Sequence, residues 1–310
     1  MFGGSSADAN ENRTPATNTN QPSNHPEGKE GKTGQTTATP LISPVNQPVV
    51  VVTGANRGLG LEFVRQLLEG GHQAQSGVSN DCIVIACCRS PDQATELKKL
   101  KSMYAKRLDI FQLDVSKKDQ IDTLAKHIND VYGRLDILIS NAGVLKHTKE
   151  NPDTADKIPL DTIKEVMEVN VYGPILLIRA LAPILRRTHD MLAKTKPAPA
   201  GDDKPTYVRA IFITSVAASM GAAINGFASY CMSKAALDRW VLAASQVYPE
   251  IAFGLMHPGW VDTDMGRIDG GEPGTSPKVS IRGMLQQLPK VTRANSARQI
   301  LAFDGTVVPF

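Results

Sequence analysis

The 310-residue sequence predicts an α/β fold, built as one doubly wound parallel sheet with helices on both faces. The first observation is the run of four valines at 49–52, because successive β-branched apolar residues suit a strand buried on both faces. The second is the stripe of Leu59, Phe63 and Leu67, which recurs every four residues and predicts a helix directly after that strand. The third is the alternation of strands and helices along the chain, which requires right-handed crossovers between parallel strands.

Further apolar runs place the remaining elements. We expect strands at 83–88, 111–115, 135–140, 210–215 and 251–256, and a short last strand within 301–308. We expect helices at about 91–101, 160–187 and 230–247, and another that opens at a Ser-Lys-Lys-Asp capping box at 116–119. Gly173-Pro174 predicts a distortion inside the long helix. The polar segments 71–81 and 188–207 predict exposed insertions, and the segment 265–288 predicts a substrate lid that ends in an amphipathic helix.

The first 47 residues differ in composition from the rest. They are rich in Asn, Thr, Gly, Pro, Ser and Gln, so they cannot bury enough surface to offset the entropy lost on ordering. We therefore expect a disordered low-complexity tail over 1–47 and a single domain over 48–310. A docking or targeting arm is the alternative for the tail, although Asp8 and Glu11 argue against a mitochondrial presequence.

Composition also narrows the function classes. The net charge of +3, carried by scattered basic residues, gives no support for a nucleic-acid partner. No apolar run approaches the roughly 20 residues that cross a bilayer, so we expect no membrane association. Cys87 and Cys88 lie in an apolar run and indicate buried thiols, which predicts a reducing, cytoplasmic location. The six histidines lack metal-ligand spacing, so we expect no metal. The sequence leaves open whether the protein is a monomer or a homo-oligomer.

The glycine-rich turn between the first strand and the first helix is a candidate anion site. Its glycines have no Cβ, so a pyrophosphate can approach the backbone, and the helix N-terminus offers N–H groups and a favourable dipole. The candidate cofactor-binding residues of this turn are Gly54, Asn56, Arg57, Gly58, Leu59 and Gly60. An ordinary tight turn is the alternative, but the turn lacks the Lys-Ser/Thr of a P-loop.

Arg89 follows the second strand, where a dinucleotide fold keeps the group that contacts the adenosine ribose. An acidic residue there would repel a 2′-phosphate, whereas Arg89 and Arg57 together favour one. We therefore expect NADPH in preference to NADH. The alternative is that both arginines are solvated surface residues.

Tyr230 and Lys234 stand four residues apart, on one face of a predicted helix. A free tyrosine has a pKa near 10, and a neighbouring cation would lower it towards neutral pH. Such a pair is often just a helix surface. Here, however, Ser215 ends the preceding strand, at the edge where ligands of such sheets bind.

These motifs, taken together, resemble the short-chain dehydrogenase/reductase family. The resemblance rests on Thr-Gly-x-x-x-Gly-x-Gly at 53–60, Asn-Ala-Gly at 141–143, Asn170, Ser215, Tyr-x-x-x-Lys at 230–234 and Pro-Gly at 258–259. The segments 257–265 and 303–310 are similar to the branch of C-factor and sniffer-like carbonyl reductases. Two details depart from the family: Ser140 replaces the first Asn of Asn-Asn-Ala-Gly, and the spacing from Ser215 to Tyr230 is slightly long, which leaves Ser219 as a lesser candidate.

The resemblance implies a Rossmann fold and a role for each motif. Tyr230 would donate a proton to a carbonyl, Ser215 would bind the same oxygen, Lys234 would hold the nicotinamide ribose, and Asn170 would anchor a water relay. For Asn170, a role in satisfying the helix distortion is compatible with the relay. The other implied cofactor contacts are Asp114 and Val115 at the adenine, Asn141, Ala142 and Gly143 at the cofactor floor, and Pro258, Gly259, Val261 and Thr263 near the nicotinamide. These could instead be ordinary loop residues.

The expected function is therefore an NADPH-dependent reductase that converts an aldehyde, ketone or quinone into an alcohol. The alternative is a regulatory or scaffold protein that keeps the fold and the cofactor without turnover. An intact set of Asn, Ser, Tyr and Lys favours the enzyme, because a pure binder needs no activated phenol.

Overall fold

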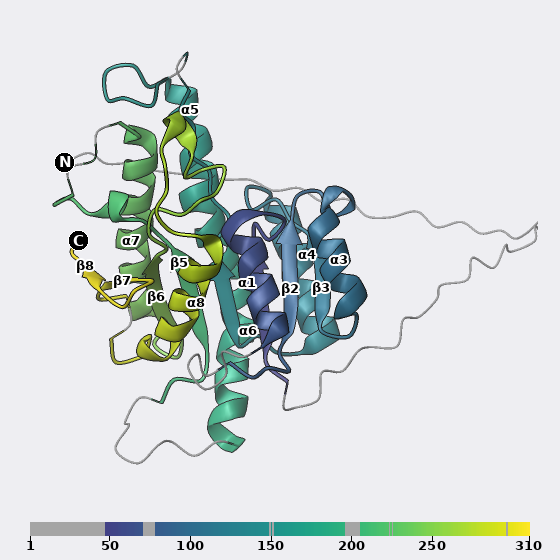
Figure 1. Cartoon of the computed structure of the whole chain (residues 1–310). Coiled ribbons are helices and arrows are strands. Elements are labelled where there is room, and N and C mark those ends of the chain that lie inside the picture. Colours follow the sequence, from purple (N-terminus) through teal and green to yellow (C-terminus); the bar gives the residue numbers. More distant parts are fainter. Residues whose placement is uncertain are drawn as a thin grey trace, which may run out of the picture. The chain divides into compact units, whose positions relative to one another are not determined.

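The computed structural model describes residues 47–70, 78–148, 150, 152–195, 205–222, 224, 226–295 and 297–310. The predicted tail, apart from Gln47, lies outside these residues, as does most of the insertion predicted at 71–81. The described chain forms one layered α/β unit (Figure 1).

A single eight-stranded sheet forms the centre of the fold, in the order β3-β2-β1-β4-β5-β6-β7-β8. Its strands are β1 (Val49–Thr53), β2 (Ile83–Cys88), β3 (Leu108–Gln112), β4 (Ile137–Ser140), β5 (Arg209–Ile213), β6 (Ala252–His257), β7 (Ile300–Ala302) and β8 (Val307–Val308). All neighbouring pairs are parallel except β7 and β8. The strand order reverses between β1 and β4, and a ligand crevice is expected at such a switch point. The predicted fold class is confirmed.

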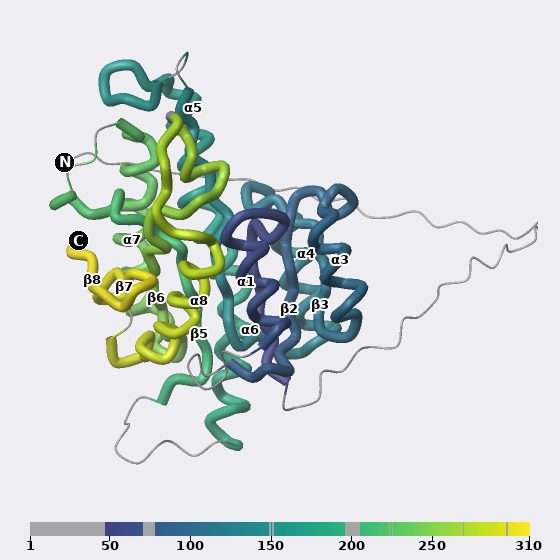
Figure 2. The backbone as a smooth tube through the Cα atoms, viewed as in Figure 1, coloured from purple at the N-terminus to yellow at the C-terminus, as the bar shows by residue number. Residues whose placement is uncertain are grey.

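Helices cover both faces of the sheet. They are α1 (Gly58–Glu69), α3 (Thr95–Met103), α4 (Lys118–His127), α5 (Leu160–Met167), α6 (Gly173–Thr195), α7 (Ala228–Val247) and α8 (Pro277–Gln287). Helices α1, α3 and α8 pack on one face with Val50 and Val52, while α4, α6 and α7 pack on the other with Val49 and Val51. All four valines are fully buried, which explains the continuous apolar run. Figure 2 shows α1 and α8 side by side on one face of the sheet.

The region after the third strand differs from the prediction. The strand spans Leu108–Gln112 rather than 111–115, because the chain turns at Asp114, whose Oδ1 accepts hydrogen bonds from the Ser116 N–H and hydroxyl at 3.0 and 2.8 Å. This use of Ser116 prevents the predicted capping box, and Lys117 precedes α4 without a side-chain cap.

The long helical region confirms the predicted distortion and extends further than expected. One turn of π-helix at Glu168–Tyr172 separates α5 from α6, directly before Gly173-Pro174. Helix α6 continues to Thr195, so the predicted start of the exposed insertion, at residue 188, lies about two helical turns too early. The whole segment Leu160–Thr195 is long and apolar enough to cross a membrane by length and composition. A core helix passes the same test, and α6 packs against the sheet.

The C-terminal region differs from the prediction in two respects. The last strand is a hairpin rather than one strand, because the Asp304-Gly305 turn reverses the chain between β7 and β8 and places Gly305 at φ 89°. The amphipathic helix predicted at the end of the segment 265–288 is present as α8, but its apolar face is already covered by the fold. Its apolar side chains Ile281, Met284 and Leu285 lie in the core, beside α1, and only the predicted apolar residue Val279 is largely exposed.

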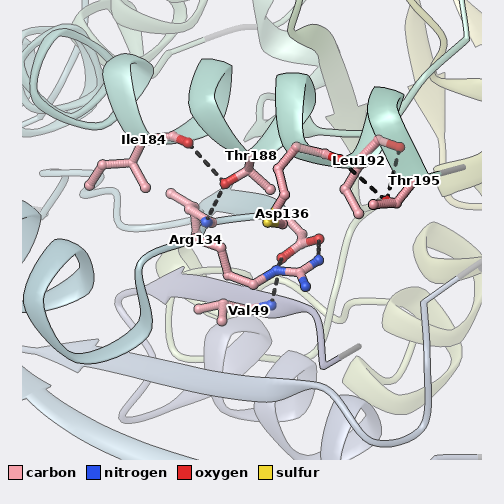
Figure 3. Close-up of polar contacts among 9 residues, drawn as sticks. Val49, Arg134, Asp136, Ile184, Thr188, Leu192 and Thr195 are labelled. Atoms are coloured by element: carbon pink, nitrogen blue, oxygen red, sulfur yellow. Dashed lines mark hydrogen bonds and ion pairs between the residues drawn. The ribbon is translucent and has the colours of Figure 1, made fainter. Parts of the chain in front are cut away.

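The amino ends of β1 and β4 are joined through Asp136, which also forms a buried ion pair with Arg134 (Figure 3). The Asp136 carboxylate accepts hydrogen bonds from the Arg134 guanidinium at 2.9 and 2.5 Å and from the Val49 N–H at 2.8 Å. Thr188 of α6 accepts from the Leu135 N–H at 2.9 Å and ties that helix to the same edge. These contacts lie at the amino edge of the sheet, whereas the loops that form the site lie at its carboxyl edge.

Candidate active site

A cleft of about 1310 Å³ lies at the carboxyl ends of the central strands. Every residue predicted to bind a cofactor lines it: Gly54, Asn56, Arg57, Gly58, Leu59, Gly60, Arg89, Asp114, Val115, Asn141, Ala142, Gly143, Tyr230, Lys234, Pro258, Gly259, Val261 and Thr263. Ser215 also lines it. The fold thus brings together side chains that lie far apart in the sequence.

The glycine turn has the close packing that its sequence indicated. A Cβ on Gly60 would lie 2.1 Å from the Gly54 carbonyl oxygen, and Gly54 itself has a φ of 65°. No side chain caps the N-terminus of α1, which begins directly after Arg57. The first N–H groups of α1 are therefore available to an anion.

Asn141 fixes this turn to the end of β4. Its side-chain amide donates to the Thr53 carbonyl at 2.8 Å, and the Asn141 and Ala142 N–H groups both donate to the Thr53 hydroxyl at 3.0 Å. The Asn-Ala-Gly motif therefore holds the glycine turn in place. Ser140, which stands where the family has the first Asn of Asn-Asn-Ala-Gly, is the last residue of β4.

Tyr230 and Lys234 lie on α7, which places both side chains under the cleft. The Tyr230 hydroxyl neighbours that of Ser215, at the start of the loop after β5, and Ser215 acts to lower the pKa of the phenol. The Lys234 ammonium is buried, donates to the Ile213 carbonyl at 2.7 Å and lies 5.6 Å from the centroid of the Tyr230 ring. Ser219, the lesser serine candidate, does not line this cleft.

Asn170 lies in the π-helical turn and does not line the cleft itself. Its amide oxygen accepts from the Val144 N–H at 2.8 Å, and its amide nitrogen donates to the Val144 carbonyl at 2.9 Å and to the Ser233 hydroxyl at 3.0 Å. A Cβ on Gly143 would lie 3.3 Å from the Asn170 oxygen and 3.7 Å from the Lys234 ammonium. The missing side chain of Gly143 thus leaves space between these two groups.

The expected electrostatic effect of Lys234 on Tyr230 is not found. Burial is the largest effect on Tyr230 and raises its pKa to about 12, with the neighbouring Ser215 hydroxyl opposing it. Burial likewise lowers the pKa of Lys234 to about 8, against the attraction of Asp238. The physical reason is that the ammonium is itself desolvated and bonded to a backbone carbonyl.

The residue that caps α7, the helix that carries Tyr230 and Lys234, was not identified from the sequence. Asp153 is buried, and its carboxylate accepts from the Ser229 N–H and hydroxyl at 2.8 Å each and from the Tyr230 N–H at 3.4 Å. The residue before α7, Phe227, has a φ of 55°. No local signal could identify Asp153, because this cap comes from a loop 76 residues earlier in the chain.

The model of the family described as short chain dehydrogenase matches residues 48–270. The chain belongs to the short-chain dehydrogenase family. It is therefore an NAD(P)-dependent oxidoreductase, and the resemblance read from the sequence motifs is confirmed.

Solved structures of this family include similar carbonyl reductases. The chain is 30% identical to the NADPH-bound carbonyl reductase from chicken fatty liver, covering 85% of this chain and 99% of that one with a TM-score of 0.70. It is 26% identical to the carbonyl reductase Sniffer of D. melanogaster, with the same coverage and a TM-score of 0.73. Among curated relatives, a benzil reductase ((S)-benzoin forming) of Saccharomyces cerevisiae is 25% identical over 240 residues, 74% of this chain and 79% of that protein.

The cleft of this short-chain dehydrogenase fits a dinucleotide. The uncapped α1 N-terminus and the close-packed glycines suit a pyrophosphate. Two arginines line the same cleft: Arg89 is exposed after β2, and Arg57 lies in the glycine turn. Arg57 already has a partner, since its guanidinium lies 2.7 Å from the Asp264 carboxylate.

Proposed function

We propose that the protein is an NADPH-dependent carbonyl reductase that converts an aldehyde, ketone or quinone into an alcohol. The observation that carries this proposal is that the neighbouring hydroxyls of Tyr230 and Ser215 line one cleft, with the Lys234 ammonium 5.6 Å from the centroid of the Tyr230 ring. Two hydroxyls that converge on one point are suited to a substrate oxygen that gains negative charge.

NADPH, when bound, supplies the hydride. The Tyr230 hydroxyl donates its proton to the substrate oxygen, and the raised pKa of this phenol keeps the proton in place until the oxygen becomes basic. The Ser215 hydroxyl donates a hydrogen bond to the same oxygen. The Lys234 ammonium lies 5.6 Å from the centroid of the phenol ring and would supply the proton that restores Tyr230.

Asn170 and Gly143 support a route for the replacement proton. The Asn170 oxygen retains one lone pair after its bond to the Val144 N–H, and the space over Gly143 lies between this oxygen and Lys234. A water molecule held there would receive protons from solvent and pass them to Lys234. Through its Ser233 and Val144 bonds, Asn170 also ties α7 to the loop after β4.

Two positive charges support the choice of NADPH over NADH. Arg89 and Arg57 come from different segments and both line the cleft, so they can bind one phosphate from two sides. The chicken liver carbonyl reductase, similar over nearly its whole length, is NADPH-bound in its crystal. No carboxylate occupies the end of β2 to repel a phosphate.

The test is NADPH oxidation by the purified protein with a panel of aldehydes, ketones and quinones that includes benzil. We expect turnover with at least one member. Tight NADPH binding without turnover on any of them would favour the regulatory or scaffold alternative. The buried free thiols Cys82, Cys87 and Cys88 support a reducing, cytoplasmic location, which fractionation of cells would test.

A further inference from the structure

His257 is the last residue of β6, directly before the Pro258-Gly259 turn, and it lines the same cleft as Tyr230. In the fold, its imidazole faces the loop that carries Ser215, which comes from the neighbouring strand β5.

The contact between them is a hydrogen bond of defined direction. The Val216 N–H donates to Nδ1 of His257 at 3.2 Å. Because Nδ1 is the acceptor, the ring is neutral and carries its proton on Nε2. Burial favours this neutral form and lowers the pKa of His257, while Asp304, in the turn between β7 and β8, is the charged group that opposes it.

This bond is one of three that hold the backbone of the loop that carries Ser215. On one side of Ser215, the Thr214 N–H donates to the Met256 carbonyl at 2.9 Å. On the other side, Val216 is held by His257, and the Ala217 N–H donates to the Ser215 hydroxyl oxygen at 3.1 Å. The side chain of His257 is therefore the one contact in this set that a change of protonation can break.

We propose that His257 is a positioning residue, whose unprotonated Nδ1 holds the Val216 N–H and thereby directs the Ser215 hydroxyl at the substrate oxygen. The proposal rests on the carbonyl reductase function above. A proton on Nδ1 would make that atom a donor that faces the Val216 N–H, so the hydrogen bond would be lost. The Val216 backbone and the adjacent Ser215 hydroxyl would then be held less firmly. Because the folded pKa lies below the ordinary histidine value, the loss occurs only on the acid side of that value.

The test compares two variants across pH 5 to 8, with NADPH and benzil. His257→Asn places an amide oxygen where Nδ1 stands and does not titrate, whereas His257→Leu removes the acceptor at similar size. We expect wild-type kcat to decline towards pH 5, His257→Asn to lose that decline, and His257→Leu to have a kcat reduced by about tenfold at every pH. The Kd for NADPH should stay within about threefold in both variants, because none of the predicted cofactor contacts is changed.

Two results would overturn the proposal: a decline towards acid that persists in His257→Asn, or a wild-type kcat in His257→Leu. The ¹⁵N chemical shifts of the His257 ring provide a readout without turnover, and a protonated Nδ1 at pH 7 would equally refute the bond. Wild-type protein without carbonyl reduction at any pH would instead refute the proposed function, while the ring shifts still report on Nδ1.

Discussion

The Arg57 guanidinium and the Asp264 carboxylate form an ion pair of 2.7 Å that joins segments 207 residues apart in the sequence. Arg57 belongs to the glycine turn, and Asp264 follows the Pro258-Gly259 turn after β6. The two segments also approach each other at Gly58, where an added Cβ would lie 3.6 Å from the Thr263 methyl group. Both residues line the cleft, and the pair engages a cation that we propose binds the 2′-phosphate.

Asp264→Asn should therefore strengthen NADPH binding, because it frees Arg57. Both side chains are largely exposed, and such pairs are worth at most about 1 kcal/mol, so we expect the Kd for NADPH to fall by no more than about fivefold. Titration of protein fluorescence would measure it. Asp262→Asn is the matched control, since Asp262 pairs with Arg267 instead. Weaker NADPH binding in Asp264→Asn would show that the pair holds the cleft closed over the cofactor.

Cofactor preference gives the second prediction. We expect kcat/KM with NADPH to exceed that with NADH by at least about tenfold, because a charge-assisted bond contributes roughly 1.5–3 kcal/mol. Arg89→Asp should shrink or reverse this ratio by weakening the use of NADPH, with little change in the KM of the carbonyl. Equal use of both cofactors by the wild type would mean that both arginines are merely solvated.

Tyr230→Phe should abolish turnover, with kcat reduced by at least about a thousandfold, and leave the Kd for NADPH nearly unchanged. The hydroxyl acts in the transition state, whereas the ring remains to line the cleft. Steady-state kinetics and a binding titration would measure the two effects separately. Tyr172→Phe is a suitable control, because Tyr172 is exposed and does not line the cleft. A variant that kept most of its kcat would exclude Tyr230 as the proton donor.

The low pKa of Lys234 predicts a decline in carbonyl reduction at alkaline pH. Burial lowers this pKa to about 8, so the ammonium is present below that pH and lost above it. Tyr230, with its pKa raised to about 12, stays protonated over the same range and does not cause the decline. Profiles of kcat/KM between pH 6 and 10 would measure it. A constant value up to pH 10 would show that the charge of Lys234 is not needed.

Asp153→Ala should destabilise the fold by roughly 2 kcal/mol, because α7 loses its capping carboxylate and the buried Ser229 loses its partner. We also expect kcat to fall, because the Asp153 carboxylate also accepts from the Tyr230 N–H and so helps to position that residue. Denaturant unfolding and kinetics would measure the two effects. Asp156→Ala, at an exposed site in the same loop, should change the free energy of unfolding by less than about 0.5 kcal/mol. Equal stability of the two variants would contradict the capping role.

The sequence by itself determined the sheet, the glycine turn and the pair of Tyr230 and Lys234, because each depends on a local pattern. Val49 to Val52 must lie in a strand buried on both faces, and residues four apart on a helix must share a face. Strand ends were less certain, as at 111–115, because a turn such as that at Asp114 competes with the ladder through a single side chain.

Only the tertiary structure decided which distant groups meet. Asp153 caps α7, His257 holds the loop of Ser215, and Asp264 pairs with Arg57, and each contact joins segments that no local pattern links. The structure also decided that α8 packs in the core, and that burial, rather than the charge of Lys234, sets the pKa of Tyr230. Desolvation depends on everything packed around a group, so it can be known only once the chain is folded.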